Sequence, residues 1–347
     1  MKKTAKILVL LLALSLSVFI VGCGKDKAEK APTNDVPKEE AVNYCPLDHA
    51  VVDNLPERVL AVAVDNGPNS EPQTNLGKAD LLFELPVEGG INRFLALYYH
   101  NQPDTIGPVR SARHCFISLV NSFGAIYVHC GASYMFTNLS DTVDEIDQMA
   151  MGSYFWRDNS RKAPVNLYTS WEKLQAAATE KGLWEKQNTT KFAFYNDKAI
   201  KALTKGTNTD INIAYTYKPV SYKWDDAANH YMRFSKGAPH MDAADNTQLY
   251  ADNVVVMKIA APLLTGDTKL LDMKFAGNSS SGVLFQNGTA TEITWSMKDE
   301  ISPLTFTMAN GKQAKFLPGR TIIQVVPDTV NVEYNGGETA AASSDAQ

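Results

Sequence analysis

Apolar positions in the first half of the chain form runs that predict buried strands. Continuous apolar runs at 58–64 and 125–130 are typical of strands that are covered on both faces. The runs at 80–87 and 91–99 flank Glu88-Gly89-Gly90, which predicts a hairpin. These four runs predict a sheet.

Helical patterns lie between and after these runs. We expect a helix from Pro108 to Phe123, because proline suits a first helical position and Gly124 can stop the helix. Thr142 and Thr169 each have a glutamate three residues later, which is the capping-box spacing. They predict two further helix starts, the second of them before an alanine-rich helix.

After about residue 208 the pattern becomes mainly β. Strands are expected at 211–217, 220–224, 231–234, 254–260, 304–308, 314–317 and 321–326. Asn287-Gly288 and Asn310-Gly311 are two-residue hairpin signals.

The predicted fold class is therefore α+β or α/β. We expect an N-terminal α/β layered domain over 45–190, a connection at 191–210, and a mainly antiparallel β domain over 211–332.

The N-terminus has the pattern of a lipoprotein signal. Three lysines precede an apolar run from Ile7 to Val21, and Gly22 stands directly before Cys23. The run is shorter than the roughly 20 residues that span a bilayer. We expect residues 1–22 to be a signal peptide that is removed when the thiol of Cys23 is lipidated. The alternatives are a retained membrane helix and an ordinary secretory signal.

This signal predicts the location of the protein. Two or three acyl chains, including a palmitate-type amide chain, would hold Cys23 firmly on the extracytoplasmic face of the cell membrane. The polar segment 23–44 predicts a flexible tether, and the Gly-, Ala- and Ser-rich segment 333–347 predicts a disordered tail.

Charge excludes one class of partner. The 347 residues include 33 basic and 38 acidic residues, a net charge of −5. Without residues 1–22, 30 basic residues face 38 acidic ones, so the net charge becomes −8. Nucleic-acid binding needs a basic surface, so we expect none.

Cysteine spacing predicts no metal site. Cys45, Cys115 and Cys130 match no zinc pattern, and we expect small buried apolar residues, with one disulfide as the alternative. His230, His240 and Asp242 could form a metal site with Asp225 or Asp226, although turn residues fit the pattern better. Neither common glycine-rich phosphate loop is present, and we expect no cofactor.

Short motifs spread over about 45–327 resemble a known family, the YerB-like lipoproteins of Gram-positive bacteria. The motifs are Val64-Asp65-Asn66, Pro72-Gln73, Lys78-Ala79-Asp80, Glu88-Gly89-Gly90, Ile106–Arg113, Tyr127-Val128-His129, Phe155–Asp158, Arg161–Pro164, Trp224-Asp225, Asn287-Gly288, Thr294-Trp295 and Leu317-Pro318-Gly319. The chain departs from the family at Ser280 and Ile322, where Gly and Trp are frequent. The resemblance implies two domains of unknown function after a lipoprotein signal, with no established enzymatic activity.

Three arginines form the first candidate site. Arg110 and Arg113 would share one side of the predicted helix, and Arg93 lies on a neighbouring strand. Arginine is unfavourable at the positive end of a helix, so we expect an anion nearby. It could be the phosphate or carboxylate of a ligand. The alternative is an internal ion-pair network with the carboxylates Asp65, Asp80, Glu84 and Glu88.

A second candidate is a polar site of Asp65, Asn66, Glu88 and His129. Asp65-Asn66 and His129 end buried strands, where ligands gather in open α/β sheets. His129 could act as a general base. The alternative is that these residues only cap turns and fill the core, and we assign no catalytic residue.

Aromatic residues at 154–156, with Tyr168 and Trp171, could form a patch on which a sugar or peptide stacks, or they could belong to the core. The signal and the lack of a catalytic motif together favour a non-enzymatic lipoprotein. We expect it to bind a cell-wall component or another envelope protein. The alternatives are a binder of an anionic wall or lipid-phosphate ligand through the three arginines, and an envelope hydrolase or transferase that uses Asp65, Glu88 and His129.

Overall fold

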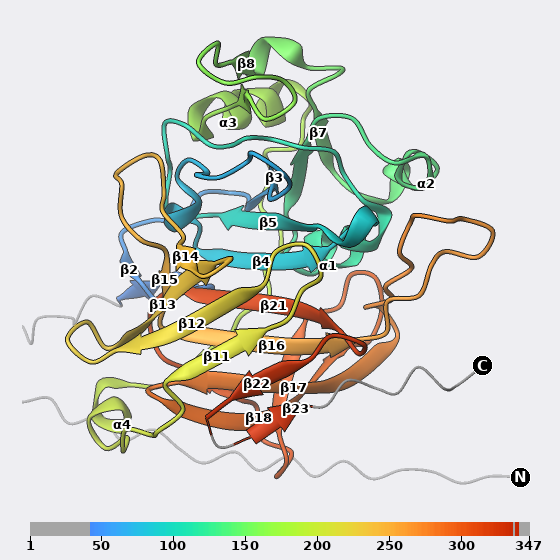
Figure 1. Cartoon of the computed structure of the whole chain (residues 1–347). Coiled ribbons are helices and arrows are strands. Elements are labelled where there is room, and N and C mark those ends of the chain that lie inside the picture. The colour runs from blue at the N-terminus through green and yellow to red at the C-terminus, as the bar shows by residue number, and fades with distance from the viewer. Residues whose placement is uncertain (1–41, 336, 340–347) are drawn as a thin grey trace, which may run out of the picture. The chain divides into compact units, whose positions relative to one another are not determined.

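Strands from both halves of the chain pair in one ten-stranded sheet (Figure 1). The computed structural model describes residues 42–335 and 337–339, so Cys23, the predicted signal and most of the tether lie outside the described residues. Along the sheet the strands are β19 (Thr305–Met308), β18 (Thr289–Met297), β17 (Asn278–Gln286), β16 (Asn253–Ile259), β21 (Thr321–Pro327), β4 (Leu81–Pro86), β5 (Asn92–Tyr98), β3 (Leu60–Asp65), β6 (Ile126–His129) and β7 (Glu145–Asp147).

The halves join where β21 pairs in parallel with β4. Thr321 lies opposite Leu81, and the pairing continues to Gln324 opposite Glu84. On its other edge β21 is also parallel to β16. The second half is mainly antiparallel, as expected, apart from the parallel strand β21, and it contributes to the same sheet as the first. The predicted connection at 191–210 contains a strand and a helix.

A second sheet of seven strands lies against the second half of the large sheet (Figure 1). Its strands are β14 (Ala238–Pro239), β13 (His230–Ser235), β12 (Val220–Asp225), β11 (Asp210–Ile213), β22 (Val332–Tyr334) and β23 (Gly337–Thr339), with β15 (Tyr250–Ala251) paired to β13. The hairpin of β22 and β23 overlaps the segment 333–347, for which the sequence predicted a disordered tail.

Three strand pairs and four helices complete the described fold. The pairs are β1 (Asn43–Tyr44) with β2 (Val51–Val52), β8 (Trp156–Arg157) with β9 (Leu167–Tyr168), and β10 (Ala193–Phe194) with β20 (Lys315–Phe316). The helices are α1 (Ile117–Ser122), α2 (Tyr134–Thr137), α3 (Trp171–Glu180) and α4 (Asp197–Lys201), besides short 3-10 turns at Leu76–Lys78, Glu88–Gly90, His114–Phe116, Ser140–Thr142 and Gly152–Tyr154. The protein combines helices and sheets as expected, but the α/β layering expected for 45–190 is not confirmed.

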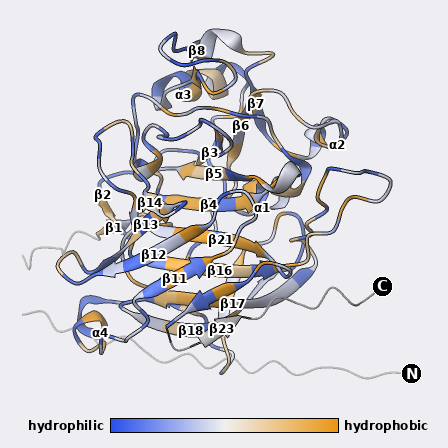
Figure 2. Cartoon of the chain, in the orientation of Figure 1, coloured by the Kyte–Doolittle hydropathy of each residue, from blue (hydrophilic) through white to orange (hydrophobic). Residues whose placement is uncertain are grey.

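The central strands of the large sheet are buried on both faces, as their continuous apolar runs predict. Alternate residues of β3 point to opposite cores: Ala61 lies in the core that contains α1, and Val62 in the core that contains α3 and the seven-stranded sheet. Figure 2 shows hydrophobic residues concentrated along β21 and β4 at the centre of the sheet. The two cores hold β3, β4 and β5 in place, and candidate site residues lie at or near the ends of these strands.

The predicted helix from Pro108 begins only at residue 117. Backbone bonds hold the start of the segment extended: Arg110 N donates to Ala63 O, and Val109 N donates to Leu167 O. The carbonyl groups that a helix would need are engaged as well, because Pro108 O accepts from Asp65 N and Arg110 O accepts from Cys130 N. Gly107 also lies close to β9, because a Cβ there would come within 2.7 Å of Leu167 O. The close packing of these two segments therefore replaces the first two turns of the expected helix.

The two capping-box predictions had different outcomes. The helix α3 forms as expected, but Ser170, rather than Thr169, accepts the capping bond, from Lys173 N. The helix predicted from Thr142 was wrong, because residues 145–147 form β7 and pair in parallel with β6. Pairing with an existing strand edge there outweighs a local helix signal.

Candidate functional site

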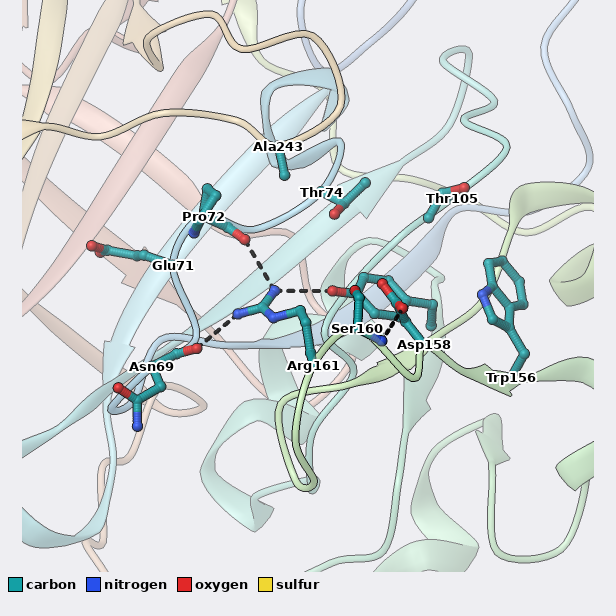
Figure 3. A pocket seen from close by; sticks show the side chains of 11 residues that line it. Asn69, Glu71, Pro72, Thr74, Thr105, Trp156, Asp158, Ser160, Arg161 and Ala243 are labelled. Atoms are coloured by element: carbon teal, nitrogen blue, oxygen red, sulfur yellow. Dashed lines mark hydrogen bonds between the residues drawn. The ribbon is translucent and has the colours of Figure 1, made fainter.

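A surface pocket of about 700 Å³ opens beside β8 and β9 (Figure 3). Its volume lies within the range of small-molecule sites. Four parts of the chain line it: the loop after β3, Thr105 from the segment after β5, the segment 156–168, and Ala243 from the second half. The lining residues are Asn69, Glu71, Pro72, Thr74, Thr105, Trp156, Asp158, Ser160, Arg161, Tyr168 and Ala243.

Arg161 holds two walls of the pocket together (Figure 3). Its guanidinium donates to Asn69 O at 2.7 Å, to Ser70 O at 2.9 Å and to Pro72 O at 3.1 Å. It also donates to the hydroxyl of Tyr168 at 2.9 Å. No carboxylate lies within ion-pair distance of Arg161 among the described residues. Four neutral acceptors thus fix the shape of the pocket and leave a positive charge in its wall.

Two aromatic side chains line the pocket at the end that is farther from Glu71 (Figure 3). Trp156 on β8 and Tyr168 on β9 are paired across the hairpin. Their ring centroids are 6.4 Å apart, with 26° between the planes. Tyr168 is buried, whereas Trp156 is partly exposed and lies at the end of the pocket opposite Glu71 (Figure 3). Trp156 therefore offers an aromatic surface to a ligand, with Tyr168 as its support.

The pocket contains two carboxylates that are ionised at neutral pH. Burial raises the pKa of Glu71, but the hydrogen bonds from Lys218 and Ser235 and the charge of Lys218 lower it more, and the net shift is downward. Lys218 Nζ and Ser235 Oγ donate to Glu71 Oε1 at 2.9 and 2.8 Å. The hydrogen bond from Ser160 lowers the pKa of Asp158. Both groups can accept hydrogen bonds from a ligand.

A buried polar network beneath the pocket joins the two sheets. Arg233 on β13 donates to Glu84 on β4 at 2.8 Å, to Tyr222 Oη at 2.9 Å and to His240 Nδ1 at 3.0 Å. Because Nδ1 accepts, we assign the proton of His240 to Nε2, which lies 2.7 Å from Gln73 Oε1.

The network continues into the pocket loop. Gln73 Nε2 donates to Asp65 O at 2.8 Å. Asn66 Nδ2 donates to Glu84 Oε1 at 2.8 Å, and Lys218 Nζ donates to Asn66 Oδ1 at 2.9 Å. The loop between β3 and β4, which supplies much of the pocket lining, is therefore held by residues of the second half.

The three candidate arginines lie near one another, although not on a helix. Arg113 makes a two-point contact with Glu88, at 2.5 and 2.7 Å. Arg110 Nε lies 3.1 Å from Asp65 Oδ2. Two of the three guanidinium groups thus have internal carboxylates as partners.

Arg93 has no carboxylate within ion-pair distance among the described residues. Its Nη1 donates to Ser111 O at 2.8 Å, and its buried Nε has no hydrogen-bond partner there. Burial, followed by the charge of Arg113, lowers the pKa of Arg93 to about 10. This cluster lines none of the described pockets.

The structure does not bring Asp65, Glu88 and His129 together as one catalytic group. Asp65 faces Arg110, and Glu88 faces Arg113. His129 is buried; its Nε2 lies 2.8 Å from Glu145 Oε2 and its Nδ1 lies 3.0 Å from Gly131 O. Asn66 belongs to the network under the pocket. Each residue has a separate structural partner.

Sequence reasoning found part of the pocket and missed the rest. The aromatic segment 154–156 and Tyr168 were candidates for a patch on which a ligand stacks, and two of these residues, Trp156 and Tyr168, pack against each other and line the pocket. Trp171 and Phe155 are in the core instead. Glu71 gave no signal of its own, because its partners Lys218 and Ser235 are far away in sequence.

These features define a β-rich protein in which two sequence regions share one sheet and one pocket. The comparisons with known proteins divide the chain in the same way. Residues 48–184 match the N-terminal domain, and residues 210–323 the C-terminal domain, of the family described as "Protein of unknown function (DUF3048)". The chain belongs to this family.

Two comparisons confirm the resemblance to YerB-like proteins. A protein of Bacillus subtilis (strain 168) named "Putative lipoprotein YerB" is 33% identical over 294 residues, which cover 81% of this chain and 85% of the relative. The crystal structure of YerB from Bacillus subtilis aligns with a TM-score of 0.75 at 30% identity, over 84% of this chain and 99% of that one. Among the helices that the structure describes, none is long and apolar enough to cross a membrane.

Proposed function

We propose that this protein is a lipid-anchored, extracytoplasmic binding module that holds a glycan of the cell wall in the pocket beside β8 and β9, without cleaving it. The lipoprotein name of the relative and the signal before Cys23 support the anchor. The pocket carries the binding part of the proposal.

The chemistry of the lining suits a sugar. The exposed face of Trp156 can pack against the C–H face of a sugar ring, while Asp158, Ser160 and Glu71 can bond its hydroxyl groups. The main observation is this pairing of a supported aromatic surface with a polar rim in one cavity of suitable size.

The charges of the pocket favour binding over hydrolysis. A glycosidase needs one carboxylic acid whose pKa is raised so that it can protonate the leaving group. The pKa values of Glu71 and Asp158 are both lowered. Neither carboxyl group therefore has the property of a general acid at neutral pH.

Co-sedimentation with purified Gram-positive cell-wall sacculi tests the proposal. The full-length protein in detergent should sediment with the sacculi, and Trp156→Ala should weaken this binding at least tenfold. Trp224→Ala is the matched control, since Trp224 is also partly exposed but lies outside the pocket lining. Equal binding by both variants, or no binding by the wild type, would reject the glycan.

The anchor has its own test. Cys23→Ser should release the protein from the membrane fraction, whereas Cys130→Ser should stay membrane-bound. If Cys23→Ser remains in the membrane fraction and is processed normally, the lipid anchor is wrong, whatever the result with sacculi.

A further inference from the structure

Three metal-ligating side chains meet near the start of the described chain, away from the pocket. Cys45 and Asp48 lie in the turn between β1 and β2, and His100 lies shortly after β5. One ligand atom from each falls within 4.8 Å of the other two. The sequence gave no hint of this group, because His100 is far from Cys45 and the three residues follow no metal-binding pattern.

The imidazole of His100 faces acidic groups on two sides. Its Nδ1 lies 2.8 Å from Asp80 Oδ1 and 3.7 Å from Asp48 Oδ1. This nitrogen is buried, yet it makes no hydrogen bond of acceptable geometry with the described residues. Asp80 Oδ1 already accepts from Asn101 Nδ2 at 2.6 Å, and Asp80 Oδ2 accepts from the backbone N–H of Tyr99. A buried nitrogen is thus left without a satisfied bond among acidic neighbours.

The cluster is acidic. Asp48 and Asp80 both lie beside the imidazole of His100, and the Cys45 thiol is a third potential anion. A bound dication would neutralise these charges and stabilise the thiolate.

We propose that Cys45 Sγ, Asp48 Oδ1 and His100 Nδ1 bind a divalent metal ion of the zinc class. Zinc accepts sulfur, nitrogen and oxygen ligands at about 2.0–2.3 Å, which places ligand atoms of a tetrahedral site roughly 3.3–3.8 Å apart. The separation of 3.7 Å between Asp48 Oδ1 and His100 Nδ1 already fits this range. The fourth position falls to a water molecule, because Asp80 Oδ1, at 2.8 Å from His100 Nδ1, is too close to be a second ligand of the same tetrahedral ion.

Such an ion would fasten the turn between β1 and β2 to the large sheet. Cys45 and Asp48 belong to that turn, and His100, which follows β5, contacts Asp80 directly before β4. The bound metal would thus join this turn to two central strands, and the site is structural rather than catalytic.

Cobalt titration of the full-length protein, in detergent with a non-thiol reductant, tests the proposal. Co²⁺ should produce a near-ultraviolet thiolate-to-cobalt band that saturates at one equivalent and is lost on addition of Zn²⁺. Cys45→Ser should remove the band. Cys115→Ser should keep it, because Cys115 is a buried thiol outside the cluster.

His100→Gln keeps the result decisive if Cys45→Ser fails to fold. This variant should retain the wild-type circular dichroism spectrum and bind Co²⁺ at least tenfold more weakly. Zn²⁺ should raise the melting temperature of the wild type but not that of His100→Gln. Absence of the band in the wild type, or a normal band in either variant, would overturn the proposal and leave His100 as a partner of Asp80 alone.

Discussion

Arg233 and Glu84 form an ion pair at 2.8 Å, and neither side chain is exposed to solvent. Arg233 belongs to the seven-stranded sheet and Glu84 to the ten-stranded sheet. The pair therefore connects the two sheets at the point where the pocket loop is also held. Loss of this ion pair would therefore affect both the packing of the two sheets and the position of the pocket loop.

Removal of Arg233 should destabilise the protein strongly. Arg233→Met would leave the Glu84 carboxylate buried without a cation, and loss of one partner of a buried pair costs about 3–5 kcal/mol. Urea unfolding followed by fluorescence would measure the loss. Lys223→Met is the control, because Lys223 is exposed on the neighbouring strand and should change stability by about 0.5 kcal/mol or less. A loss below about 1 kcal/mol in Arg233→Met would contradict the importance of this pair.

The stability of the protein should decrease with acidity because of His240. Burial, followed by the charge of Arg233, lowers the pKa of His240 to about 3, whereas its ordinary value is 6.5. The unfolded chain thus binds a proton that the folded chain excludes. This contribution to stability is present above about pH 6.5 and is lost as the pH falls from there toward about 3, by up to roughly 1.4 kcal/mol per pH unit.

Urea midpoints measured between pH 7 and pH 4 would show this dependence. His240→Gln should have a smaller slope over the same range, because it lacks the titrating group. An unchanged slope would mean that His240 is protonated in the folded protein.

The arginine cluster should stabilise the fold rather than bind a ligand. Arg113→Met removes two charged hydrogen bonds to Glu88 and should cost about 1.5–3 kcal/mol. Arg110→Ala should cost less, because 30% of the Arg110 side chain is exposed. Both variants should bind sacculi as the wild type does.

The opposite outcome would favour the anionic ligand. If Arg110→Ala retains its stability but no longer binds sacculi that carry anionic polymers, the binding site is the cluster of Arg93, Arg110 and Arg113. Sacculi stripped of these polymers would then fail to bind the wild type as well.

Local sequence patterns predicted the elements whose backbone hydrogen-bond partners are close in the sequence. The runs at 80–87 and 91–99 form β4 and β5 around the expected turn, and the alanine-rich segment forms α3. The prediction of secondary structure failed where residues distant in sequence form hydrogen bonds with the backbone of a segment. The segment after Pro108 stays extended because Ala63 and Leu167 bond its backbone.

The same distinction explains the candidate sites. Trp156 and Tyr168 are close in sequence and suggested an aromatic patch. Glu88 was one of four carboxylates considered as internal partners of the arginine cluster, and it pairs with Arg113, although the helix expected there does not form. Glu71 with Lys218, and Cys45 with His100, come together only through the topology of the sheets, which a pattern of single residues does not encode.

The parallel pairing of β21 with β4 also constrains how this family can evolve. The four residues Leu81–Glu84 align with Thr321–Gln324 across the boundary between the two family domains. A recombination event that exchanged one domain would leave a central strand edge bare unless the replacement supplied a matching strand. Such a bare edge invites aggregation. The two domains are therefore expected to be inherited together, as a single unit of selection.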